Sequence, residues 1–137
     1  MRSQDIYEMQ FTIPFAPVTK KNSQRILRKK NGGAFIAPSE KYKEYEEKAV
    51  NYLAYYAHVP FCDYPVNVKA VFCMPTARRC DLVNLLEALD DVLVKAGILP
   101  DDNYTIIASH DGSRVGVDRE NPRTEVTITE VEQDETD

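Results

Sequence analysis

The sequence predicts an α+β fold, a mixed α/β sandwich in which two main helices pack on a small sheet of about four strands. Two observations carry this prediction. Apolar residues recur at helical spacing in two segments, whereas other segments are β-prone or alternate between apolar and polar residues. The helices are predicted at 39–56 and 81–95, and the strands at 9–13, 66–74, 104–109 and 124–131.

A basic hairpin is predicted between the first strand and the first helix. Asn31, Gly32 and Gly33 separate two short apolar stretches, and the glycines suit a turn with positive φ. Six basic residues lie in and before this hairpin: Lys20, Lys21, Arg25, Arg28, Lys29 and Lys30. No acid occurs from Val18 to Ser39. Such a stretch alone is typical of a solvated surface, but it also suits contact with nucleic-acid phosphates.

The first helix is predicted to begin after Ser39, whose hydroxyl is typical of an N-cap. A stripe of aromatic and small residues follows at helical spacing: Tyr42, Tyr45, Ala49, Tyr52 and Tyr56. Tyrosines can stack on nucleic-acid bases, but this spacing favours packing against the core.

Length and composition indicate a single domain, predicted over 1–131, followed by an acidic, disordered tail at 132–137. Residues 130–137 hold five of the 22 acids, so the rest of the chain balances 17 acidic residues against 17 basic ones. No apolar run approaches the about 20 residues of a membrane span. The N-terminus also lacks the apolar segment of a secretory signal, so we expect a cytoplasmic protein without membrane contact.

The three cysteines argue against a zinc site or a disulfide framework. Their number is odd, they show no C-x-x-C spacing, and the chain has only two histidines. Cys73 lies in an apolar run and is expected to be a small core residue.

The second helix carries one apolar face and one acidic ridge on opposite sides. At about 100° per residue, the apolar face collects Leu82, Leu85, Leu86, Leu89, Val92, Leu93 and Ala96. The acidic ridge consists of Asn84, Glu87 and Asp91. Glu87 and Asp91 are four residues apart, where like charges repel mildly, so their pairing favours a cation at this place. The alternative is the ordinary polar face of an amphipathic helix.

Further acids flank this helix. Asp81 at its start suits either an N-cap or a metal ligand, and Asp101 and Asp102 suit either a turn or a metal site. If the next strand runs beside the previous one, Asp81 and Asp102 could meet. Carboxylates that converge on one point suit Mg²⁺, which would activate water and stabilise charge on a phosphodiester.

The segment from Arg78 to Glu87 reads RRCDLVNLLE, and it is followed by Asp91, by Lys95-Ala96-Gly97 and by Asp101-Asp102. This pattern resembles the signature of the RusA-type Holliday junction resolvases. That family typically shows R-x-D-L-D-N-L-x-K, an Asp four residues on, a K-x-G helix end and a D-D turn. The first strand, the loop at Lys20-Lys21-Asn22-Ser23 and the last strand are also similar, so the resemblance covers nearly the whole chain.

The resemblance implies a homodimer that binds four-way DNA junctions and nicks two strands symmetrically, with Mg²⁺, or Mn²⁺ in its place, at acidic sites. By position, Asp81 matches the first essential Asp, Asp102 the last, and Asn84 the family Asn in a supporting role. The candidate metal ligands are Asp81, Glu87, Asp91, Asp101 and Asp102, and the candidate catalytic residues are Asp81, Glu87 and Asp102.

Two positions depart from the family pattern. Val83 stands where the family has its second catalytic Asp, and Glu87 where it has a catalytic Lys. These positions share a helix face one turn apart, so we hypothesise that Glu87 replaces the missing carboxylate and that Lys20 or Lys21 supplies the missing cation. The rival hypothesis is a catalytically impaired protein that binds junctions without cutting. A third is an unrelated metal-dependent hydrolase of small phosphate esters.

The candidate DNA-binding residues are Lys20, Lys21, Asn22, Arg25, Lys29, Lys30, Arg78, Arg79 and Arg114. Arg114 closes a polar run from His110 for which a turn is the favoured interpretation. His110 has no partner visible in the sequence, which makes it a poor candidate for a general base.

Overall fold

The computed structural model describes residues 8–20, 24–57 and 62–131. Lys21, Asn22 and the predicted tail at 132–137 therefore lie outside the described residues, as does the side chain of Arg25. The elements are β1 (Glu8–Ile13), β2 (Gln24–Arg28), β3 (Ala34–Pro38), α1 (Glu40–Tyr52), a π-helical turn (Leu53–Ala57), β4 (Val66–Met74), α2 (Leu82–Lys95), β5 (Ile107–Ser109), β6 (Arg114–Val117) and β7 (Arg123–Glu130).

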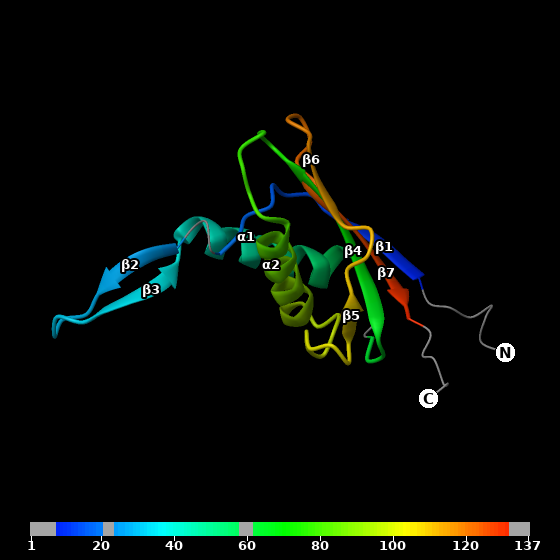
Figure 1. Cartoon of the computed structure of the whole chain (residues 1–137), viewed down its shortest axis with the longest axis horizontal. Helices are drawn as coiled ribbons and strands as arrows, with labels where there is room; N and C mark the ends of the chain where they lie inside the picture. The colour runs from blue at the N-terminus through cyan, green and yellow to red at the C-terminus, as the bar shows by residue number, and fades with distance from the viewer. Residues whose placement is uncertain (1–7, 21–23, 58–61, 132–137) are drawn as a thin grey trace.

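A mixed sheet of five strands forms one layer, and α1 and α2 form the other, which confirms the predicted α+β class (Figure 1). The sheet order is β1-β7-β4-β5, with β6 also paired to β4. β7 is antiparallel to both β1 and β4, whereas β5 and β6 run parallel to β4. In β4, Val66, Val68, Ala70 and Phe72 are buried in alternation with more exposed residues, so the sheet has one covered face.

The sheet differs from the prediction at β5 and β6. β5 begins at Ile107 rather than Tyr104, because the carbonyl of Asn103 accepts the N–H groups of Ile106 and Ile107 and closes a turn there. Arg114 begins a strand instead of closing a turn, and this strand pairs with the second half of β4. β5 and β6 thus share one edge of β4, which gives five strands where about four were expected.

The β2–β3 hairpin forms a separate two-stranded sheet that extends away from the body of the protein (Figure 1). Gly32 has φ of 92°, as its predicted turn requires, and the Lys29 N–H donates to the Gly33 carbonyl at 2.7 Å. Arg28, Lys29 and Lys30 are exposed at the tip of this hairpin. An isolated two-stranded ribbon of this size buries little apolar surface, so burial contributes little to its stability.

The start of α1 and its tyrosine stripe follow the prediction. The Ser39 hydroxyl accepts the Tyr42 N–H at 3.2 Å and caps the helix. Tyr42, Tyr45 and Ala49 are buried, so this part of the stripe packs in the core rather than being available to bases, while the side chain of Tyr56 lies outside the described residues.

The helix α2 lies on the covered face of the sheet through its predicted apolar side. Leu85, Leu89 and Leu93 are almost fully buried and belong to the same core cluster as Phe72 and Ile128. Gly97, with φ of 80°, ends the helix as expected, and Cys73 is a buried core residue. Within the described residues, no helix is long and apolar enough to cross a membrane.

Candidate active site

Asp81 occupies the N-cap position of α2 and is exposed. Its carboxylate makes no capping bond to the helix backbone, but Oδ2 accepts the Asn84 side-chain amide at 3.3 Å. The predicted supporting residue therefore contacts the first candidate ligand. An exposed carboxylate that is held by one amide and not used for capping is available for another partner.

The acidic ridge of α2 holds a cation supplied by the chain itself. The Lys20 ammonium forms an ion pair with the Asp91 carboxylate. The hydrogen bond to Asp91 raises the pKa of Lys20, and Glu46 and Glu87 add to the effect through their charges. Of the two lysines expected to replace the family cation, Lys20 thus lies beside the ridge, and this pairing offsets the repulsion between Glu87 and Asp91.

A second set of contacts ties this lysine to both helices. The buried Tyr42 hydroxyl donates to Glu46 at 3.0 Å, and Lys95 donates to the other oxygen of Glu46 at 2.9 Å. The Lys20 ammonium lies 5.8 Å from the centre of the Tyr42 ring. Burial and the neighbouring Glu46 raise the pKa of Tyr42, so its hydroxyl stays a neutral donor.

Asp101 and Asp102 lie in the exposed turn beyond α2. Asp101 accepts the Asp102 N–H at 2.7 Å and the Asn103 amide at 3.1 Å. The backbone bond from Asp102 lowers the pKa of Asp101. Asp101 thus serves the turn itself, and the exposed Asp102 carboxylate lies beside it.

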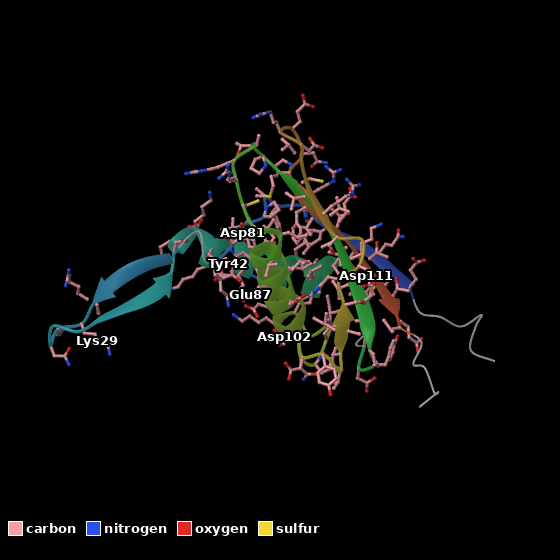
Figure 2. The ribbon with its side chains drawn as sticks, in the orientation of Figure 1. Lys29, Tyr42, Asp81, Glu87, Asp102 and Asp111 are labelled. Atoms are coloured by element: carbon pink, nitrogen blue, oxygen red, sulfur yellow. The ribbon has the colours of Figure 1, made fainter. Side chains whose placement is uncertain are left out.

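The candidate ligands do not converge within one chain. Val66 at the start of β4 pairs with Ile107 of β5, whereas Asp81 follows the opposite end of β4. A parallel crossover must return along its helix, so Asp81 and Asp102 lie at opposite ends of α2 (Figure 2). Over the residues that the structure describes, no three acidic, histidine or cysteine side chains form a group suited to a metal. As the prediction required, β5 lies beside β4. However, the chain enters β5 next to the start of β4, whereas Asp81 follows the end of β4.

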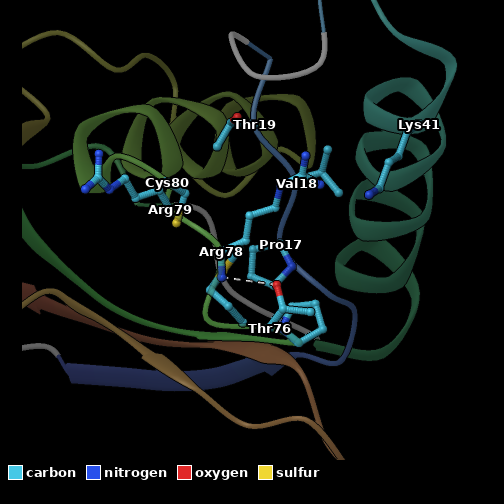
Figure 3. A pocket seen from close by; sticks show the side chains of 10 residues that line it. Pro17, Val18, Thr19, Lys41, Thr76, Arg78, Arg79 and Cys80 are labelled. Atoms are coloured by element: carbon cyan, nitrogen blue, oxygen red, sulfur yellow. Dashed lines mark hydrogen bonds between the residues drawn. The ribbon is translucent and has the colours of Figure 1, made fainter.

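A cleft of about 450 Å³ opens at the Asp81 end of α2. Its lining residues are Pro17, Val18, Thr19, Lys41, Met74, Pro75, Thr76, Arg78, Arg79 and Cys80. Lys41 comes from α1, and Arg78 and Arg79 come from the loop that leads into α2 (Figure 3). This cationic cleft includes two predicted DNA-binding residues and one, Lys41, that the sequence reasoning missed, because only folding brings α1 beside the loop. Arg114 is exposed on β6.

We predict that Lys41→Ala weakens binding of a four-way DNA junction several-fold. A lysine that contacts one phosphate contributes about 0.9 to the slope of log affinity against log salt concentration, so this slope should fall by about that amount. Titrations of labelled junction at several salt concentrations measure it. Lys43→Ala is the matched control, because Lys43 lies on the same helix but lines a different hollow. Equal effects of the two variants would exclude Lys41 from the DNA contact.

His110 has a partner that the sequence did not reveal. Its Nε2 lies 3.1 Å from both carboxylate oxygens of Asp90, a residue of α2 that is only 8% exposed. The hydrogen bond to Asp90 raises the pKa of His110, and burial raises the pKa of Asp90. The pair joins the end of β5 to α2, which is an anchoring role.

This pair predicts a pH-dependent stability. Because the folded state raises the pKa of His110, the stabilisation is complete below its unfolded pKa of about 6.5 and is lost as the pH rises above that value through the folded pKa. The melting temperature should therefore fall between pH 6 and pH 9. Asp90→Asn removes the charge that holds the proton and should flatten this dependence. Parallel curves for the two proteins would refute the linkage.

Comparison with known proteins agrees with the resemblance in sequence. Residues 14–129 match the family described as Endodeoxyribonuclease RusA, a span that runs from the end of β1 into β7. A Crossover junction endodeoxyribonuclease RusA from Aquifex aeolicus (strain VF5) is 30% identical over 99 residues, which cover 72% of this chain and 75% of that protein. Both ends of α2, with Asp81 and Asp102, fall within the family match. The chain belongs to the RusA family of endodeoxyribonucleases.

Proposed function

We propose that this protein resolves four-way (Holliday) DNA junctions by paired hydrolysis of phosphodiester bonds supported by Mg²⁺, with Mn²⁺ as a substitute. The observation that carries the proposal is the cationic cleft in a chain of an endonuclease family: its Arg78 and Arg79 closely precede Asp81 in the chain, and Lys41 of α1 adds a third positive charge. The name of the relative from Aquifex aeolicus states the same substrate, a crossover junction.

The positions of the cations suit a branched substrate. The cleft offers three positive charges that could hold a phosphate, and its lining ends at Cys80, the neighbour of the candidate carboxylate in the chain. Lys29 and Lys30 are exposed at the tip of the hairpin, and Figure 2 shows Lys29 away from the body of the protein. Contacts with phosphates position a protein on a duplex without reading its sequence. Because the hairpin cations lie away from the cleft cations, the two groups suit DNA whose arms diverge.

The carboxylate oxygens of this chain are ligands of the kind that a hard cation prefers. Their positions within a single chain, however, do not suit such a cation. Mg²⁺ requires several oxygen ligands about 2.1 Å away, and Asp81 with Asn84 provides too few of them. Asp91 is already paired with Lys20. One chain alone therefore does not fit the ion.

Glu87 remains our candidate for the carboxylate that Val83 lacks. It is exposed, it lies on the acidic ridge, and its charge acts on Lys20. We predict that Glu87→Gln lowers the rate of junction nicking by about 10-fold or more, while junction binding persists. Nicking at the wild-type rate would refute the relocation of the ligand to Glu87.

Two measurements test the proposed function. Gel shifts at stated salt compare a four-way junction with a linear duplex of the same sequence, and Mg²⁺ or Mn²⁺ is then added to the complex. We expect preference for the junction followed by symmetric nicks. Junction binding without nicks in either metal would identify the catalytically impaired alternative. Val83 favours this alternative, because it is exposed and provides no carboxylate where the family has its second catalytic Asp. Equal, weak binding to both DNAs would contradict a resolvase.

A further inference from the structure

Tyr104 is the most exposed large apolar side chain among the residues that the structure describes. Its exposed fraction is 83%, and it lies two residues after Asp102, a candidate catalytic carboxylate. We propose that the Tyr104 ring stacks on a base that the branch point of a DNA junction leaves without a stacking neighbour. This inference rests on the proposed function, and it makes Tyr104 a residue that selects branched DNA over duplex DNA.

The turn that carries Tyr104 is held in place on both sides. Leu99 before it and Ile106 after it belong to the buried core. Within the turn, the Thr105 N–H donates to the Asn103 side-chain oxygen at 2.9 Å, and the Ile106 N–H donates to the Asn103 backbone carbonyl at 3.0 Å. The ring is therefore presented to solvent from an ordered backbone, and binding immobilises only its two side-chain torsions.

The charge of this turn favours bases over phosphates as the part of DNA that approaches Tyr104. The exposed segment 100–105 contains Asp101 and Asp102 and no basic residue. Two carboxylates repel a phosphate backbone, whereas the face of a base carries no net charge. Aromatic side chains stack on any base, because every base has a π-face. The ring and its acidic neighbours therefore suit a nucleobase.

A four-way junction offers such a base, whereas a continuous duplex does not. Each base inside a duplex lies between two neighbours that cover both of its faces. At an open branch point, the last base pair of each arm loses one neighbour, and one face becomes available to a side chain. An aromatic ring on that face replaces part of the lost stacking, so its contribution to affinity is confined to DNA whose strands diverge.

Replacement of Tyr104 by Ala tests this role. We expect affinity for a four-way junction to fall by about 5-fold or more, while affinity for a linear duplex of the same sequence stays unchanged. The slope of log affinity against log salt concentration should also stay at its wild-type value, because the tyrosine side chain is uncharged. In this respect the variant should differ from Lys41→Ala. Equal losses on the two DNAs would contradict stacking at the branch point.

Two further variants separate stacking from other effects. Tyr104→Phe keeps the ring and should bind the junction like the wild type. Tyr55→Ala removes another tyrosine, 72% exposed, from the π-helical turn after α1, and it should leave the preference for the junction unchanged. The melting temperature of each variant shows that it is folded. A loss of preference in Tyr55→Ala as large as that in Tyr104→Ala would overturn the inference.

Fluorescence of 2-aminopurine, an adenine analogue whose emission is quenched by stacking, detects the contact directly. The analogue is placed in turn at the bases on each side of the branch point, and the metal-free complex is measured at saturation. At one of these positions, we expect lower emission with the wild type and Tyr104→Phe than with Tyr104→Ala. Equal emission from the wild type and Tyr104→Ala at every position would overturn the inference and leave the proposed function standing.

A gapped duplex distinguishes failure of this inference from failure of the proposed function. It presents unstacked bases opposite the gap but contains no junction. If the wild type bound junctions no better than linear duplexes, the proposed function would fail. Quenching opposite the gap that depends on Tyr104 would still support the stacking contact, and its absence would overturn the inference as well.

Discussion

Replacing Asp81 by Asn is expected to reduce the rate of strand nicking by about 100-fold or more. Losses of this size are typical when an enzyme loses one group that stabilises charge in the transition state. Binding of the junction should persist, because the cationic cleft keeps Lys41, Arg78 and Arg79. Asn has the shape of Asp and can still contact Asn84. Single-turnover cleavage of a synthetic four-way junction with enzyme in excess measures the rate, and a gel shift without metal measures binding.

Asp63→Asn provides the control for this variant. Asp63 is also exposed, but it lies before β4, away from the loop that leads into α2. Its replacement makes the same chemical change at the surface and should leave nicking unchanged. Wild-type nicking by Asp81→Asn would remove Asp81 from the site and with it the argument from the start of α2.

Leu89→Ala is expected to destabilise the folded protein by about 2–5 kcal/mol. Leu89 is 1% exposed at the middle of the apolar face of α2, so its loss leaves a cavity between the helix and the sheet. A change of this size lowers the melting temperature by about 10 °C or more in a domain of this length. Urea unfolding, with the slope checked for two-state behaviour, gives the free energy.

Val117→Ala is the matched apolar truncation at the surface. Val117 on β6 is 50% exposed, and its shortening should change the free energy of unfolding by less than about 0.5 kcal/mol. Similar losses in the two variants would show that α2 is not packed as described.

Local patterns predicted the elements that position the candidate site. The apolar positions of α2 recur every three or four residues, and Ser39 and Gly97 mark helix ends through their own backbone and side-chain chemistry. The bounds of β4 follow likewise from a continuous β-prone run. Such signals act within a few residues and can therefore be recognised without the tertiary structure.

Contacts between distant segments could not be predicted in the same way. His110 meets Asp90, and Lys41 meets the loop before α2, only because the crossover and α1 pack on one face of the sheet. The family pattern led to Lys20 as one of two candidates, but it did not show that Lys20 binds Asp91. The direction of the crossover also separates Asp81 from Asp102, and residue spacing carries no information on that direction.

The place of β7 in the sheet has a consequence for how the protein is made. β7 is the strand between β1 and β4, and Thr124 pairs with Ile13 on one side and Phe72 on the other. During synthesis at about 5–20 residues per second, β1 must wait on the order of 10 s for this partner to appear. Until then β1 and one edge of β4 expose unpaired backbone groups, which invite pairing with other nascent chains. The emergence of β7 from the ribosome, rather than local helix formation, therefore sets when the sheet can close.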